Sequence, residues 1–174
     1  LPLPPTAMPW TTADIPDQSG RLALVTGANS GLGLETARAL AARGATVLLA
    51  CRSLERAEAA RQQLVGTDGG PGTVAIRGDA LTPLQVDLAD LTSVAAAATH
   101  VSERWSQVDL LINNAGVMAP PRQLSRQGFE LQFAVNHLGH FALTQRLLPL
   151  LNQSPDARVV HVSSGAAYFG RMAF

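Results

Sequence analysis

The chain has 174 residues, of which 47% are hydrophobic and 15% charged, and its 13 acidic side chains balance 13 basic ones. This composition excludes a disordered chain, and the zero net charge argues against a nucleic-acid partner. No apolar run approaches the roughly 18 residues that cross a bilayer, and Cys51 is the one cysteine. We therefore expect no internal disulfide, no transmembrane segment and a cytoplasmic location.

The first 20 residues are rich in proline, threonine and aspartate and have no hydrophobic periodicity. They predict an extended lead-in, and residues 1–5 lack the basic flank and apolar core of a signal peptide. From Arg21 onwards, short apolar runs alternate with stretches of helical spacing. We expect residues 21–174 to form the N-terminal portion of a single domain.

The alternation of strands and helices predicts an α/β fold, a Rossmann-like doubly wound parallel sheet. We expect helices at about residues 34–41, 54–65, 90–105 and 127–151, the last one long or broken. In that last helix, the residues expected to face mostly inward are Phe129, Phe133, Leu138, Phe141, Leu143 and Leu147. The expected strands are residues 22–25, 45–50, 84–86, 108–112 and 158–162, with 73–76 as a further candidate. The sheet would be incomplete, with about five strands in the order 3-2-1-4-5 and the last strand at an open edge.

The turn after the first strand, residues 26–33, reads TGANSGLG. It lies between a buried strand and an amphipathic helix, which is the context that a dinucleotide-binding turn requires. Glycines let the backbone approach a pyrophosphate, and the free N–H groups of the following helix stabilise the negative charge. An ordinary glycine turn would explain any one of these glycines, but their position between strand and helix favours phosphate binding.

Arg52 follows the second strand, 19 positions after Gly33. A Rossmann protein specific for NAD places an acidic residue there, on the ribose hydroxyl. Here no carboxylate ends the strand, and a guanidinium can pair with the 2′-phosphate of NADP through two hydrogen bonds. The pattern favours NADP over NAD, and the alternative is a solvated arginine at the start of a helix.

Other residues that could carry chemistry are better explained by packing. His137 and His140 have helical spacing but no third metal ligand close in sequence, so we expect no metal site. His161 lies within a strand, either as a structural residue or behind the site, and Cys51 is expected to be a small buried hydrophobe. No Gly-x-Ser-x-Gly elbow surrounds Ser164, which disfavours a serine hydrolase.

Five further motifs, taken in order with the glycine turn, resemble the short-chain dehydrogenase/reductase family over residues 20–174. They are Asp87-Leu88, Asn113-Asn114-Ala115-Gly116, the NHLGHF segment that begins at Asn136, Val162-Ser163-Ser164, and Leu49-Ala50-Cys51-Arg52. Within that family the chain looks like the subgroup of retinol dehydrogenases, WW-domain oxidoreductases and protochlorophyllide reductases. The resemblance implies that Ser164 and Asn136 are catalytic. It implies that the cofactor contacts Thr26, Gly27, Asn29, Ser30, Gly31, Leu32, Gly33, Arg52, Asp87, Leu88, Asn114, Ala115 and Gly116.

The chain departs from the family in the groups that move the proton. The family uses a tyrosine followed four residues later by a lysine, which lowers the tyrosine's high intrinsic pKa. Tyr168 lies only four residues after Ser164, too near it for the family pattern, and Met172 occupies the lysine position. All 13 basic residues are arginines, and Arg171 has a different reach. We therefore expect the N-terminal part of a longer reductase, inactive by itself.

These observations predict an NADP(H)-dependent oxidoreductase that acts on a small-molecule alcohol or carbonyl, expected to be lipophilic. The alternative is a non-catalytic nucleotide-binding or regulatory module. A Rossmann-like methyltransferase is disfavoured by the segment 113–116 together with Asn136 and Ser164. A homo-oligomer of the full-length parent stays open, since the family's usual dimer helices include one that these residues do not supply.

Overall fold

The computed structural model describes residues 10–67, 70 and 73–165. Five parallel strands form one sheet in the order β3-β2-β1-β4-β5, which confirms the predicted fold class and strand order. The strands are β1 (Leu22–Thr26), β2 (Thr46–Cys51), β3 (Leu81–Gln85), β4 (Leu110–Asn113) and β5 (Arg158–His161).

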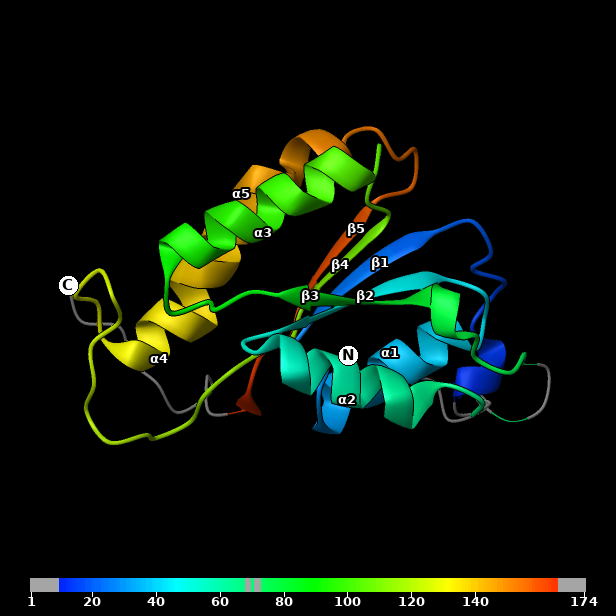
Figure 1. Cartoon of the computed structure of the whole chain (residues 1–174), viewed down its shortest axis with the longest axis horizontal. Helices are drawn as coiled ribbons and strands as arrows, with labels where there is room; N and C mark the ends of the chain where they lie inside the picture. Colours follow the sequence, from blue (N-terminus) through cyan, green and yellow to red (C-terminus); the bar gives the residue numbers. More distant parts are fainter. Residues whose placement is uncertain (1–9, 68–69, 71–72, 166–174) are drawn as a thin grey trace, which may run out of the picture.

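Helices cover both faces of this sheet, as doubly wound folds require. On one face lie α1 (Gly31–Ala41) and α2 (Leu54–Leu64), and on the other lie α3 (Leu91–Arg104) and α5 (His140–Leu151) (Figure 1). The one-turn helix α4 (Leu131–Phe133) continues through the π-helical segment η3 (Ala134–Gly139) into α5. Two 3-10 turns, η1 (Thr12–Asp14) and η2 (Gly78–Ala80), precede β1 and β3.

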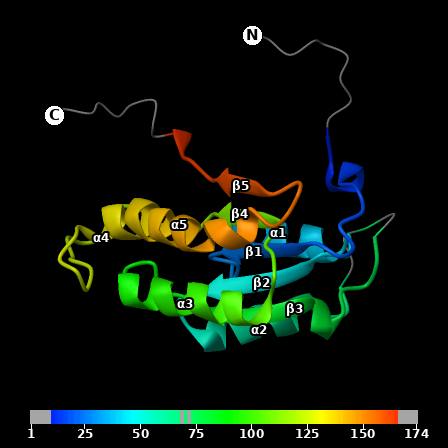
Figure 2. The same ribbon diagram turned by 90° about the horizontal axis from the view of Figure 1, so that it is seen from above.

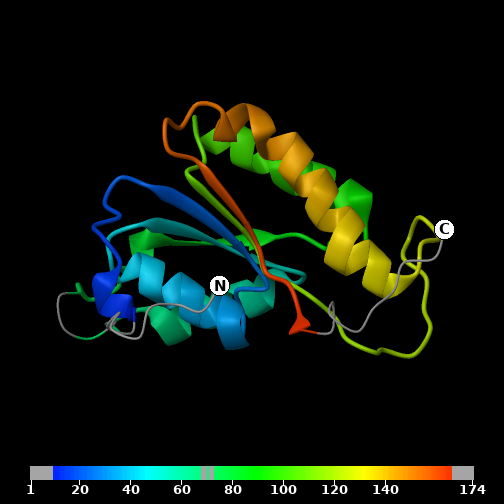
Figure 3. The same cartoon turned by 180° about the vertical axis from the view of Figure 1, so that it is seen from behind.

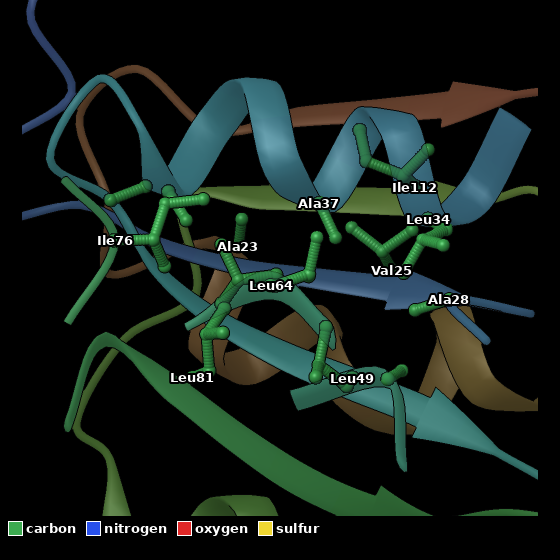
Figure 4. Close-up of a cluster of buried hydrophobic side chains, with 14 of the residues drawn as sticks. Ala23, Val25, Ala28, Leu34, Ala37, Leu49, Leu64, Ile76, Leu81 and Ile112 are labelled. Atoms are coloured by element: carbon green, nitrogen blue, oxygen red, sulfur yellow. The ribbon is translucent and has the colours of Figure 1, made fainter. Parts of the chain in front are cut away.

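The core has two layers because successive side chains of a strand point to opposite faces. In β1, Ala23 and Val25 face α1 and α2, whereas Leu22 and Leu24 face α3 and α5. Figure 4 shows the first layer, in which Ala37 of α1 packs over the central strands. Every residue of β1 is buried, as expected for a central strand covered on both faces.

β5 is the outermost strand on its side of the sheet (Figures 2 and 3). All four of its residues are exposed, including the apolar Val159 and Val160. The expectation of an open edge at the fifth strand is thus confirmed for the described residues. The carboxyl ends of all five strands nevertheless meet at the same margin of the sheet, where the predicted site residues lie.

The third strand differs from its predicted position. Residues 73–76 form irregular backbone, in which Val74 and Ile76 bond to loop carbonyls of Ala42 and Thr67. β3 instead begins at Leu81 and includes Pro83, a residue type that normally interrupts a strand. Proline is accepted there because β3 lies at the edge of the sheet that the described residues form, next to β2.

The long predicted helix at 127–151 starts late and is broken. Gly128 has a left-handed backbone (φ 83°), and Glu130 caps the chain by accepting bonds from the amides of Gln132 and Phe133. The helix therefore begins at Leu131 and changes to π-helical geometry at Ala134.

The prediction that this segment's phenylalanines face inward is wrong. Phe129, Phe133 and Phe141 are 42%, 49% and 58% exposed. The π-helical segment shifts the helical face, so that Gly139 and His140 turn towards the sheet instead. Leu143 and Leu147 are buried as predicted.

The described residues contain no helix with the length and apolar character that a membrane span needs.

Candidate active site

A cavity of about 790 Å³ lies at the carboxyl ends of the central strands, where open α/β sheets bind their ligands. It takes in every predicted cofactor-binding residue except Thr26 and Gly31. Those that line it are Gly27, Asn29, Ser30, Leu32, Gly33, Arg52, Asp87, Leu88, Asn114, Ala115 and Gly116. The structure therefore brings together four predicted segments that are far apart in the sequence.

The glycine turn forms the floor of the cavity, and two of its glycines are required by geometry. Gly27 has a left-handed backbone (φ 67°), and a Cβ there would lie 3.0 Å from the Cα of Ala115. A Cβ on Gly33 would lie 2.5 Å from Nδ2 of Asn114 and closer still to the carbonyl oxygen of Gly27. Helix α1 can therefore lie this close to the ends of the strands only because Gly27 and Gly33 have no side chain.

Thr26 is buried beneath this floor and ties β1 to β4. Its hydroxyl oxygen accepts hydrogen bonds from the backbone amides of Asn114 (2.9 Å) and Ala115 (3.0 Å). The side-chain amide of Asn114 donates to the Thr26 carbonyl (2.8 Å). Although Thr26 does not line the cavity, it fixes the two backbone segments that do.

The first turn of α1 contributes Leu32 and Gly33 to the cavity lining. The opening N–H groups of a helix have no partner within the helix, and the aligned peptide dipoles add partial positive charge. Ser30 is the N-cap residue, yet its hydroxyl accepts no bond from these amides. This helix end, next to Gly27 and Gly33, fits a pyrophosphate.

Two arginines lie on the β2 side of the cavity. Arg52 follows β2, and Arg56 lies one turn further along, in α2. Within the described part of the chain, neither guanidinium forms an ion pair. Two unpaired cations in one cavity favour an anionic group. Sequence reasoning missed Arg56, although the four-residue spacing from Arg52 is a helical signal.

The part of the lining that follows β3 contains carboxylates that are already engaged in hydrogen bonds. Asp87 accepts a hydrogen bond from the amide of Ala89, and Asp90 caps α3 through the amide of Thr92. Hydrogen bonding from Gln127, together with Arg126, lowers the pKa of Asp90 to about 2 despite the opposing effect of desolvation. The segment 123–126, another part of the lining that the sequence did not indicate, is held to Asp90 in this way.

The two predicted catalytic residues are not in the cavity lining, and Asn136 is linked to it through Val117. The side-chain amide of Asn136 pairs twice with the backbone of Val117, a lining residue, with distances of 2.8 and 2.9 Å. Ser164 is exposed beyond the end of β5. Tyr168, Arg171 and Met172 lie outside the described residues.

The remaining candidates take structural positions. His137 is exposed and stacks between the rings of Phe133 and Phe141, with centroid distances of 5.4 and 6.4 Å. Cys51 is buried, and burial raises the pKa of its thiol to about 11, which makes it a poor nucleophile. No cluster of three potential metal ligands occurs among the residues that the structure describes.

Comparison with known proteins decides the family. Residues 21–174 match the family model described as short chain dehydrogenase. The chain belongs to this family. Members of the short chain dehydrogenase family bind nicotinamide cofactors, and the cavity, with its glycine floor and free helix amides, fits such a group.

The relatives also place the chain within the family. It is 43% identical to human retinol dehydrogenase 13 over 159 residues, which are 89% of this chain and 44% of that protein. It is likewise 43% identical to a short-chain dehydrogenase/reductase of Armillaria gallica over 170 residues, or 95% and 52% of the two chains. These matches confirm the predicted retinol dehydrogenase-like subgroup.

A solved structure supports the same conclusion. An uncharacterised protein from Mycobacterium paratuberculosis is 44% identical, with a TM-score of 0.75, over 94% of this chain and 53% of that one. The chain therefore spans about half the length of the short chain dehydrogenases that it matches.

Proposed function

We propose that this chain binds NADP(H) and forms the nucleotide-binding part of an alcohol/carbonyl oxidoreductase. The observation that carries the proposal is the pair Arg52 and Arg56, unpaired within the described residues and lining the same cavity as the glycine turn. With the pyrophosphate at the start of α1, the adenosine ribose would extend towards the end of β2. Its 2′-phosphate would then meet two guanidinium groups.

NADP is favoured over NAD by what the end of β2 contains. A carboxylate at this position would accept hydrogen bonds from the free ribose hydroxyls of NAD and repel a phosphate. Here the strand ends in Cys51 and is followed by Arg52. One charge-assisted hydrogen bond contributes about 1.5–3 kcal/mol, so Arg52 alone should favour NADPH over NADH by at least about tenfold.

The test compares affinities of the purified chain for NADPH and NADH before and after Arg52→Asp. The substitution should weaken NADPH binding by about 10- to 100-fold, because a carboxylate repels the 2′-phosphate. It should leave NADH binding unchanged or improve it, because the carboxylate can accept hydrogen bonds from the free ribose hydroxyls. Arg146→Asp makes the same change of charge on an exposed position of α5, outside the cavity, and should leave both affinities unchanged. An unaltered affinity ratio in Arg52→Asp would show that Arg52 does not read the phosphate.

For the whole protein we propose hydride exchange between the nicotinamide and a small-molecule alcohol or carbonyl, as the names of the retinol dehydrogenase relatives suggest. A lipophilic substrate fits those names. In this proposal Ser164 binds the reacting oxygen, and Asn136, held by Val117, supports proton transfer. Cytoplasmic location and self-association stay predictions.

The 174 residues by themselves should bind the cofactor without turnover. They contain no lysine, so the tyrosine–lysine pair that would move the proton is not among them. This observation also favours the second candidate, a nucleotide-binding module without catalysis. NADPH consumption with a lipophilic aldehyde, measured against a heat-inactivated control, should be absent, and consumption above that control would contradict both the proposed inactivity and the module.

A further inference from the structure

A buried histidine joins two segments of the site that the proposed function does not connect. His140 is 4% exposed, at the start of α5. Its Nε2 atom lies 2.9 Å from the hydroxyl oxygen of Thr26, and its Nδ1 atom lies 3.2 Å from the backbone carbonyl oxygen of Asn136. One ring therefore touches both the strand that leads into the glycine turn and the π-helical segment with the predicted catalytic asparagine.

The hydrogens around Thr26 can be assigned by counting. A threonine hydroxyl has one hydrogen to donate and two lone pairs. Both lone pairs are taken by the backbone amides of Asn114 and Ala115. The hydroxyl must therefore donate, and its nearer acceptor is Nε2 of His140 at 2.9 Å, compared with the carbonyl oxygen of Ile112 at 3.3 Å.

This assignment fixes the state of the imidazole. If Nε2 accepts a hydrogen bond, it carries no proton, and a neutral ring has its hydrogen on Nδ1. Nδ1 faces the Asn136 carbonyl, which can only accept. Burial lowers the pKa of His140, the hydrogen bond to the Asn136 carbonyl raises it, and the nearby His161 on β5 lowers it; the net lowering agrees with a neutral ring.

The backbone explains why the Asn136 carbonyl is available to the ring. In a regular α-helix this carbonyl would accept the amide of the residue four positions on, which is His140. Here the His140 amide bonds to the carbonyl of His137 instead. The imidazole N–H thus replaces a backbone donor at the π-helical segment, a feature often found at functional sites.

We propose that His140 is a positioning residue that, as the neutral Nδ1–H tautomer, locks the Thr26–Asn114 junction to Asn136. The Asn136 side chain in turn holds Val117, and Asn114 to Val117 form one wall of the cavity. His140 thereby sets the wall opposite the arginines, where the nicotinamide half of the cofactor would lie. This last step rests on the proposed function.

The first test reads the tautomer directly in the wild-type chain at neutral pH. Side-chain ¹⁵N NMR should show a protonated Nδ1 and an unprotonated Nε2 for His140. The exposed His137 serves as the reference and should show no single fixed tautomer. A protonated Nε2, or a charged His140 ring, would overturn the proposal. This test needs neither cofactor nor variant.

The second test separates positioning from general destabilisation. His140→Ala should weaken NADPH binding about tenfold, while 2′,5′-ADP, which carries only the adenosine half and its phosphate, should bind unchanged. His140→Gln, which can still accept from Thr26, should recover part of the loss. Leu143→Ala removes a buried apolar side chain one turn further along α5 and should destabilise the fold while leaving the NADPH to 2′,5′-ADP affinity ratio unchanged.

The outcomes distinguish this inference from the proposed function. An equal loss for both ligands in His140→Ala, or the same ratio change in Leu143→Ala, would contradict the positioning role. If wild type binds neither ligand, the proposed function fails and the link to the nicotinamide half fails with it. The tautomer then decides alone whether His140 joins the two segments.

Discussion

Replacing Gly33 with alanine should damage the cofactor site more than the fold. The added Cβ would lie 2.5 Å from Nδ2 of Asn114, whereas real Cβ contacts essentially never fall below 3.0 Å. The neighbours must therefore separate by at least 0.5 Å, the difference of these two distances. The carbonyl of Gly27, which the Cβ would approach even more closely, is backbone and cannot rotate away.

The energetic cost has two parts of opposite sign. Forcing an extra carbon into a packed position costs about 1–3 kcal/mol, and alanine regains up to about 1 kcal/mol of helix propensity over glycine. We expect a net loss of about 1–2 kcal/mol in the free energy of unfolding, small enough for the chain to fold. The displaced turn should nevertheless bind NADPH at least about tenfold more weakly, since the backbone donors no longer converge on the pyrophosphate.

Denaturant unfolding and a calorimetric titration with NADPH measure the two effects. Gly20→Ala is the control, because a Cβ added to Gly20 would meet no other atom within 4 Å, although its left-handed backbone (φ 79°) adds a strain that Gly33 does not have. It should lose about 1 kcal/mol of stability through backbone strain and keep its NADPH affinity. A folded Gly33→Ala variant that binds NADPH as wild type does would refute the close-approach argument.

Three further predictions concern the scaffold. Burial opposes ionisation of Asp109, but hydrogen bonds, that from Ser154 foremost, hold the pKa of its carboxyl below the ordinary value of 3.8. Asp109→Asn should therefore cost about 2 kcal/mol at neutral pH, and urea unfolding should show this difference shrinking as the pH falls through the lowered pKa. Leu111→Ala, at a fully buried position of β4, should cost about 3–5 kcal/mol in the same assay. Asp90→Asn should loosen the segment held by Arg126, seen as faster amide exchange at residues 123–127 with little change in global stability; unchanged exchange would contradict the tether.

Much of the fold was predictable because its signals are local. Buried strands such as Leu22–Thr26 are nearly continuous apolar runs, and the glycine turn of residues 26–33 leads into the predicted helix, which begins at Gly31 rather than at residue 34. The third strand was placed too late in the sequence because Pro83 normally breaks a strand, although the predicted strand order already put this strand at an edge, where proline is accepted.

Which side of the helix after Glu130 is buried could not be predicted correctly from the sequence. Helical periodicity assumes a constant 3.6 residues per turn, and the π-helical segment η3 changes that phase. Phe141 therefore faces solvent while His140 is buried. The lack of a third metal ligand near His137 and His140 predicted packing histidines, but the two hydrogen-bond partners of His140 could be identified only from the structure.

The site was predictable where the residues follow a motif. The glycine turn, Arg52 and the segment 114–116 all contribute to the lining of one cavity, and the range matched by the family model includes them. Arg56 and the segment 123–126 carry no such motif, and their place in the lining follows from the packing of α2 and of the loop held to Asp90.

The central claim is that the cavity at the carboxyl ends of the strands is built for a phosphorylated dinucleotide. Isothermal titration calorimetry of the folded wild-type chain with NADPH, and separately with NADH, tests it most directly. We expect saturable binding of one NADPH per chain, at least about tenfold tighter than NADH. No detectable heat with either nucleotide, on a sample shown to be folded by circular dichroism, would contradict it.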